Sequence, residues 1–242
     1  MEKNEKTAMI LAAGRGERLR PLTDSTPKPL VVAGGKPLIL WQMERLALAG
    51  FRHLVINIAY LGAQIVDFVK KSPDVLRLNF KSILFSVEKE ALETAGGIKT
   101  ALPLIQKTAG DLPFLITNAD IYAEFDYLKF YETYKNLKNN QAAILLVNNP
   151  QHNKNGDFSL CNNKICFVLK DNTLTYSGTG IFTADFFKDI KKNEIYKLKP
   201  LLDSAILENR LFGEKTTHYW LDVGNIARLN ELKKYLIKNG LC

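Results

Sequence analysis

"MILAAGRGERLRPLTDSTPKPL", residues 9–30, joins an apolar run to a glycine-rich turn that is followed by basic residues. A strand that runs into Gly14-Arg15-Gly16 lets backbone N–H groups point at a ligand, because glycine lacks the Cβ atom that would block close approach. A dinucleotide-binding turn needs a third glycine that opens a helix, but this chain has Leu19 there, and the P-loop spacing is absent as well. The stretch therefore predicts a phosphate-binding loop of another kind.

Three cations follow the glycine turn. Arg15, Arg18 and Lys28 supply positive charge, and Pro27 and Pro29 flank the lysine. The two prolines stiffen the backbone, which lowers the entropic cost of holding the ammonium group in place. A solvated turn explains any one of these cations alone. All three together, just after a buried strand, favour a polyphosphate site.

Strand-like and helix-like patterns alternate along the first 147 residues. Apolar runs typical of buried strands lie at 7–13, 53–59, 82–88, 113–120 and 141–147. Helical patterns lie at 37–50, around 65–69, at 96–105 and at 125–139. Such alternation predicts an α/β protein with a mixed, mostly parallel central sheet covered by helices on both faces.

The alternation ends after residue 148. Asn and Asp turns separate short strand-like segments at 157–161, 164–169 and 173–182, which we expect to form a small β insert. Helical patterns at 199–208 and 226–239 follow. Because we find no linker, repeat or low-complexity tract, we expect one domain over residues 1–242.

The charge and the length of the apolar runs indicate which classes of partner to expect. The 242 residues carry a net charge of +8, but the lysines are scattered and form no stripe interleaved with aromatic residues. We therefore expect small anionic substrates as partners and no nucleic acid. No apolar run approaches the roughly 20 residues that span a bilayer. The first residues also lack the order of a signal peptide, so we expect a cytoplasmic protein without a membrane partner.

The cysteines do not predict a metal site. Cys161 and Cys166 could be a metal pair, but no second pair or histidine cluster accompanies them. We expect reduced structural cysteines instead.

Two aspartates are candidate metal ligands. Asp120 ends a predicted strand, and ligands of open α/β sheets bind outside the carboxyl ends of strands. Asp222 precedes the last predicted helix. Two carboxylates together with phosphate oxygens suit Mg²⁺, a hard cation that uses few protein ligands. The alternative is two aspartates that cap helices or face water.

The segment "LAAGRGERLRPLTDSTPKPLV" (11–31) resembles the signature of the sugar-phosphate nucleotidyltransferases, Leu-Ala-x-Gly-x-Gly-x-Arg-Leu followed by Pro-Lys-Pro. "ETAGGI" (93–98), "NAD" (118–120) and "WLDVG" (220–224) follow in the family's order. The resemblance implies a Rossmann-like fold. It also implies attack of a sugar 1-phosphate on the α-phosphorus of a nucleoside triphosphate, with release of pyrophosphate and formation of a nucleotide sugar.

The resemblance also assigns roles to individual positions. It implies catalytic roles for Arg18 and Lys28 and a metal site of Asp120 and Asp222 for Mg²⁺, with Mn²⁺ as a substitute. It places nucleotide binding at Leu11, Ala12, Ala13, Gly14, Gly16, Glu88, Gly96 and Asn118. It places sugar-phosphate binding at Glu93, Asp157, Gly178 and Trp220. The nucleotide half would be about residues 7–120 and the sugar-phosphate half about 121–242.

The segment 88–97, Glu-x-Glu-x-Leu-Glu-Thr-x-Gly-Gly, bears on the choice of nucleotide. A carboxylate at Glu88 can accept N–H donors from a base edge, but guanine and uracil both offer one. Solvent-facing loop charge is the alternative.

The form of this segment resembles the short N-acetylmuramate 1-phosphate uridylyltransferases of cell-wall recycling. "GDF" (156–158), "LTYSGTGIF" (174–182) and the short length without a left-handed β-helix agree with that subgroup. The resemblance implies UTP and N-acetylmuramate 1-phosphate as substrates, UDP-N-acetylmuramate as product, and Asp157 facing the sugar. A hairpin turn is the alternative for Asp157.

Ala95 and Ala119 depart from the subgroup's usual glycines. "TAGG" (94–97) also keeps mannose-1-phosphate guanylyltransferases and other hexose-1-phosphate nucleotidyltransferases as alternatives. A nucleotide-sugar-binding regulatory protein is the non-enzyme alternative, but it would be expected to lose some of the buried charges that this chain keeps. We expect a monomer or a small homo-oligomer.

Overall fold

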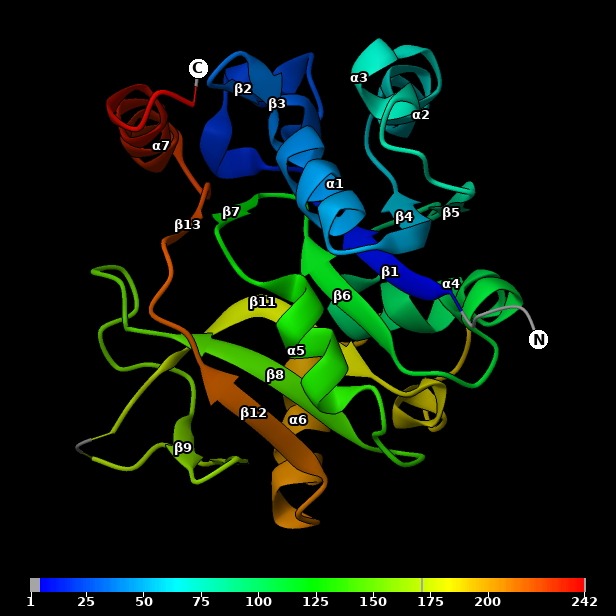
Figure 1. The fold of residues 1–242 in the computed structure, drawn as a ribbon, viewed down its shortest axis with the longest axis vertical. Coiled ribbons are helices and arrows are strands. Elements are labelled where there is room, and N and C mark those ends of the chain that lie inside the picture. Colours follow the sequence, from blue (N-terminus) through cyan, green and yellow to red (C-terminus); the bar gives the residue numbers. More distant parts are fainter. Residues whose placement is uncertain (1–4, 171, 242) are drawn as a thin grey trace.

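A nine-stranded mixed sheet runs through the computed structural model of the chain, which describes residues 5–170 and 172–241 (Figure 1). Its strands are β1 (Lys6–Leu11), β4 (Phe51–Ile58), β5 (Ser82–Val87), β6 (Phe114–Asn118), β8 (Ala142–Val147), β9 (Ser159–Cys161), β10 (Lys164–Cys166), β11 (Thr175–Phe182) and β12 (Leu211–Lys215). Their order is β5-β4-β1-β6-β11-β8-β12-β10-β9. The strands from β5 to β6 are mutually parallel, and β11 is antiparallel to both β6 and β8. The predicted mixed, mostly parallel sheet is confirmed.

Two small ribbons accompany the main sheet. β2 (Val32–Ala33) pairs with β3 (Lys36–Pro37), and β7 (Ile121–Ala123) pairs with β13 (Trp220–Asp222). The second ribbon joins segments about a hundred residues apart, with Asp222 opposite Ile121. It therefore brings the region after β6 next to the start of the last helix.

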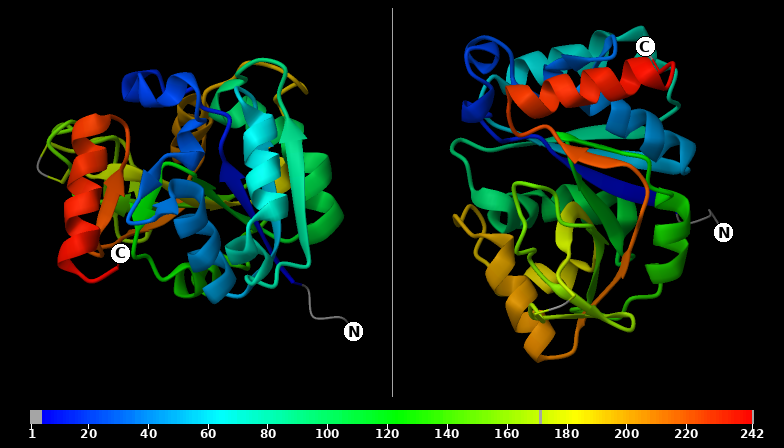
Figure 2. Two further views of the ribbon diagram at one scale, coloured as in Figure 1. Left: turned by 90° about the horizontal axis from the view of Figure 1, so that it is seen from above. Right: turned by 90° about the vertical axis from the view of Figure 1, so that its left-hand side faces the viewer.

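The helices form layers on both faces of the sheet (Figure 2). They are α1 (Leu38–Leu48), α2 (Gly62–Lys71), α3 (Pro73–Leu76), α4 (Glu93–Ala109), α5 (Tyr127–Tyr134), α6 (Leu198–Leu207) and α7 (Ile226–Lys238). Short 3₁₀ turns are η1 (Glu17–Leu19), η2 (Leu22–Asp24), η3 (Lys28–Leu30) and η4 (Ala184–Phe187). Among the residues that the structure describes, no helix has both the length and the apolar character needed to cross a membrane.

Alternating side chains of the central strands build a core on each face. In β1, Ala8 and Ile10 join the core under α1, α2 and α5, whereas Met9 joins the core under α4 and α6. All three are fully buried, as expected for a parallel strand covered on both sides. This double burial explains why the strand reads as one unbroken apolar run.

Several element boundaries differ from the prediction. Helix α4 begins at Glu93, before the glycines, and is longer than the predicted 96–105. Helix α5 begins later than predicted, because the Asp126 side chain caps it by accepting the Lys129 N–H at 2.9 Å. Of the predicted small β insert, β9 and β10 extend the edge of the main sheet through β12. The segment 173–182 does not belong to an insert, because its strand β11 lies in the centre of the main sheet between β6 and β8.

The two neighbouring cysteines contradict the sequence expectation. Cys161 ends β9 and Cys166 ends the neighbouring strand β10, and the structure joins them in a disulfide. Their Cα atoms lie 6.2 Å apart, within the usual range for such a bond. The prediction of reduced thiols is therefore wrong for this pair. Cys242 lies outside the described residues.

Candidate active site

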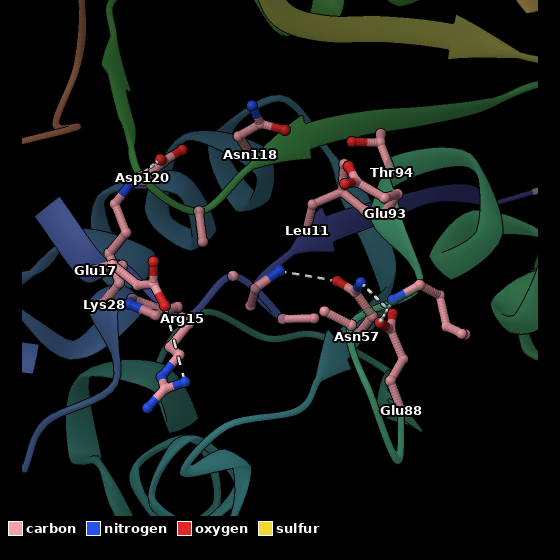
Figure 3. Close-up of a pocket in the computed structure, with 18 of the residues that line it drawn as sticks. Leu11, Arg15, Glu17, Lys28, Asn57, Glu88, Glu93, Thr94, Asn118 and Asp120 are labelled. Carbon is pink, nitrogen blue, oxygen red and sulfur yellow. Dashed lines mark hydrogen bonds and ion pairs between the residues drawn. The ribbon is translucent and has the colours of Figure 1, made fainter. Parts of the chain in front are cut away.

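A cavity of about 610 Å³ opens where β1 and β6 end (Figure 3). The chain leaves β1 to form β4 on one side, and later returns to form β6 on the other side. Such a switch point leaves a crevice outside the carboxyl ends of the strands. The cavity is lined by residues 11–18, 28–29, 57, 88, 91–94, 118–120 and 224.

Most of the predicted site residues lie in this lining. They are Leu11, Ala12, Ala13, Gly14, Gly16, Arg18, Lys28, Glu88, Glu93, Asn118 and Asp120. The segments that carry them are far apart in the sequence, and the sheet brings their ends together. Their individual roles in binding and catalysis stay predictions.

The glycine turn folds back over Lys28. Gly16 has a φ of 71°, and a Cβ atom added there would lie 2.9 Å from Lys28 Cβ. The Thr23 hydroxyl donates a hydrogen bond of 2.8 Å to the Gly16 carbonyl and holds this turn in place. Gly14 differs, because an added Cβ atom would meet nothing within 4 Å. The packing of the protein itself therefore does not require a glycine at position 14.

Ion pairs hold the two predicted metal ligands. Lys28 Nζ donates to Asp120 Oδ2. Arg228 Nη1 donates to Asp222 Oδ1 at 2.5 Å, and His152 Nε2 lies 3.2 Å from the same oxygen. Burial raises the pKa of the Asp222 carboxyl above its usual range, while Arg228 and His152 oppose this and the negative charge of Asp120 adds to it. The two carboxylates are thus close enough to repel each other.

The donor set fits a divalent cation. Each aspartate uses one oxygen in its ion pairs, and Asp120 Oδ1 and Asp222 Oδ2 accept no hydrogen bond from the described residues. Among residues 5–170 and 172–241, no cluster of three or more His, Cys, Asp or Glu side chains is arranged to bind a metal without other ligands. Mg²⁺ suits this arrangement because it keeps several waters and takes further oxygens from substrate phosphates.

Asp157 does not line the cavity. Its Oδ1 accepts from Asn153 Nδ2 at 3.0 Å and its Oδ2 accepts from the Tyr176 N–H at 2.8 Å. The carboxylate thereby ties the loop before β9 to β11. Each carboxylate oxygen thus accepts one hydrogen bond within the protein, and contact of Asp157 with the sugar stays a prediction.

Asp222 also lies outside the lining, next to Asp120. Three further predicted residues pack outside it as well. The Gly96 N–H donates to the Tyr196 carbonyl at 3.1 Å, and an added Cβ would collide with the Glu194 carbonyl. Gly178 lies against the Asn118 side chain, where an added Cβ would be 2.6 Å from Nδ2. Trp220 Nε1 donates to the Ser177 carbonyl at 2.9 Å. The structure explains these three residues by packing and backbone support.

Sequence reasoning missed several residues at the site. Asn57 lines the cavity although it lies in an apolar strand, and its polarity within "HLVINIA" was the available signal. Arg228 and His152 reach Asp222 from a helix and a loop 76 residues apart. No local pattern indicates a contact between such distant segments.

The ion pair between Arg228 and Asp222 is expected to stabilise the folded protein. The Arg228 side chain is only 9% exposed, so Arg228→Ala leaves Asp222 partly buried without its main cation. Because Asp222 keeps some contact with water, we expect a loss of about 2–3 kcal/mol in the free energy of unfolding, measured in urea.

Arg77→Ala is the matched control, because Arg77 and Asp74 form an exposed pair. We expect that change to cost no more than about 0.5 kcal/mol. Equal losses for the two variants would contradict the assignment of Arg228 as the buried partner of Asp222.

Comparison with known proteins agrees with this geometry. The family model described as nucleotidyl transferase matches residues 7–239. An N-acetylmuramate alpha-1-phosphate uridylyltransferase of Neisseria meningitidis serogroup B is 46% identical over 228 residues, which cover 93% of this chain and 95% of that protein. A mannose-1-phosphate guanyltransferase of Yarrowia lipolytica is 40% identical over 139 residues, 57% of this chain and 36% of that protein.

Solved structures share the fold. The crystal structure of a putative glucose-1-phosphate thymidylyltransferase from Bacillus anthracis superposes with a TM-score of 0.81, over 96% of this chain and 94% of that chain. The two sequences are only 19% identical, so this likeness concerns the fold alone. Because the family model spans nearly the whole sequence, the chain belongs to the nucleotidyl transferase family.

Proposed function

We propose that this protein transfers the uridylyl group of UTP to N-acetylmuramate α-1-phosphate, forming UDP-N-acetylmuramate and pyrophosphate. The proposed reaction is supported chiefly by one observation. The glycine turn, Lys28 and Asp120 line the same cavity at the switch point of the sheet. The choice of substrates is supported by the uridylyltransferase relative, which this chain matches over nearly its full length. The guanyltransferase relative is matched over a much smaller part of its length.

The two ends of the cavity suit the two parts of a nucleotide. Leu11, Asn57 and Glu88 lie at one end, with the Ala12 N–H bonded to Asn57, and Lys28 and Asp120 lie at the other end (Figure 3). The turn at Gly14 lies between them and leaves room that no protein atom fills. We therefore place the base and ribose at the first end and the phosphates at the second.

In the proposed reaction, an oxygen of the sugar phosphate attacks the α-phosphorus of UTP, and the bond to pyrophosphate breaks. Lys28 is held in η3 between Pro27 and Pro29, so it acts as a fixed cation and not as a base. Arg18 adds a second positive charge toward the triphosphate. Asp120 and Asp222 would hold Mg²⁺, which would supply positive charge to the phosphate oxygens in the transition state.

The same proposal names the binding partners of the protein and its place in the cell. The partners are the two small substrates, and the reaction would belong to the reuse of cell-wall sugars in the cytoplasm. Glu93, at the start of α4, lines the cavity and stays the candidate for contact with the sugar. Asp157 stays a second candidate, because each of its oxygens can accept a further hydrogen bond beside the one that it already accepts.

Substrate preference tests the proposal. We expect UTP with N-acetylmuramate 1-phosphate to give a kcat/KM at least about 100-fold above that for GTP with mannose 1-phosphate, because unpaired polar groups disfavour the wrong pair. Pyrophosphate release measures both reactions. Faster turnover of GTP with mannose 1-phosphate would replace the proposed substrates with those of a guanylyltransferase.

Metal dependence gives a second test. We expect EDTA to abolish activity and Mg²⁺ or Mn²⁺ to restore it, and Asp120→Ala to lower kcat by about a hundredfold or more. The matched control is Asp189→Ala, an exposed aspartate outside the cavity lining, which should leave kcat unchanged. Circular dichroism of both variants checks the fold. Full activity in EDTA would remove the metal from the proposal.

A further inference from the structure

Asn57 and Glu88 form a buried polar pair at the end of the cavity where we place the base. Asn57 Oδ1 accepts the Ala12 N–H at 2.8 Å, and Asn57 Nδ2 donates to Glu88 Oε1 at 2.6 Å. Glu88 Oε2 accepts the Leu92 N–H at 3.2 Å. The two residues are only 4% and 5% exposed. One continuous chain of hydrogen bonds therefore links the loop after β1 to the start of α4 (Figure 3).

The surrounding backbone is shaped to hold this pair. Asn57 lies near the end of β4, and Glu88 follows β5, its parallel neighbour, with the Glu88 N–H donating to the Ile58 carbonyl at 2.8 Å. A Cβ atom added at Gly97 of α4 would lie 2.6 Å from Glu88 Oε1 and 3.0 Å from Asn57 Nδ2. The helix can approach the pair only because position 97 is a glycine.

Burying the Glu88 carboxylate costs free energy of folding, so a functional reason for the pair is expected. Burial raises the pKa of the Glu88 carboxyl, and the hydrogen bonds from Asn57 and Leu92 only oppose this effect. A buried carboxylate with two well-placed donors fixes its neighbours more rigidly than an apolar contact would, because hydrogen bonds are directional. Here the fixed neighbours are the backbones at Ala12 and Leu92, which both line the cavity.

We propose that Asn57 and Glu88 are a positioning pair, which sets the separation of the Ala12 and Leu92 backbones on the two sides of the nucleotide base. The inference rests on the proposed nucleotide site and adds to it the device that shapes the pocket for the base. It predicts that nucleotide affinity depends on the match of donors and acceptors within the pair. The presence of a carboxylate at position 88 in particular is not required.

A donor–acceptor swap tests this inference. Asn57→Asp alone places two carboxylates against each other, and Glu88→Gln alone leaves one amide oxygen for two donors. In the double variant, the new carboxylate at position 57 accepts from Ala12 and from the new amide at position 88. That amide's oxygen accepts from Leu92. Every hydrogen bond is restored, and the net charge equals that of the wild type.

We expect each single variant to raise the Kd and KM for UTP about tenfold to a hundredfold, the usual effect of losing a hydrogen bond to a charged group. The double variant should return to within about threefold of the wild type. The KM for the sugar phosphate should rise less than the KM for UTP, because we place the phosphates at the other end of the cavity. Calorimetry with UTP and Mg²⁺ gives the Kd without the sugar phosphate.

Glu90→Gln is the matched control, because it makes the same chemical change at an exposed residue outside the lining. It should leave the Kd for UTP unchanged. A folded double variant that binds UTP no better than Glu88→Gln would overturn the inference and favour direct contact of the Glu88 carboxylate with the base. A double variant that fails to fold would also overturn it, because the restored hydrogen bonds should hold the two backbones in place. Single variants with wild-type affinity would overturn it too.

The same experiment separates this inference from the proposed function. If the wild type binds another nucleoside triphosphate in place of UTP, the proposed substrates fail. The swap is then measured with that nucleotide, and its outcome still decides the role of the pair.

Discussion

The parallel pairing of β1 with β6 brings the glycine turn and Asp120 to the same edge of the sheet. Leu11 lies opposite Asn118, and the Ala119 N–H donates to the Leu11 carbonyl at 2.9 Å, so the two strands end together. Because β4 pairs with the other edge of β1, the chain after β1 and the chain after β6 leave the sheet side by side. The glycine turn and Asp120 therefore face one cavity although about a hundred residues separate them.

A second set of contacts brings the C-terminal part of the chain to this cavity. The β7–β13 ribbon places Asp222 beside the segment that follows Asp120, and the Val223 N–H donates to the Asp120 carbonyl at 2.7 Å. Gln42 of α1 supports the ribbon from the core, because its Nε2 donates to the Ile121 carbonyl at 2.5 Å. Each of the two aspartates is paired with a cation, Asp120 with Lys28 and Asp222 with Arg228.

Local patterns predicted much of the fold and part of the site. The apolar runs at β1, β4 and β6 are visible in the sequence because both faces of these strands are buried, and the glycine turn can be recognised from a few adjacent residues. The contacts of Asn57 with Glu88 and of Arg228 with His152 could not be predicted, because they join segments that meet only after the sheet has formed. The Cys161–Cys166 pair depends on the register of the β9–β10 hairpin, which local patterns leave open. Asp157 likewise meets Tyr176 of β11 only in the folded chain.

We propose that the nucleotide lies along one cavity, with its base near Asn57 and Glu88 and its phosphates near Lys28 and the two aspartates. A crystal structure of the protein with UDP-N-acetylmuramate and Mg²⁺ would show this arrangement. We expect uracil between the Ala12 and Leu92 backbones, the diphosphate beside Lys28, and the metal on Asp120 and Asp222. A uracil ring bound at the Lys28 end, or a metal held away from both aspartates, would contradict it.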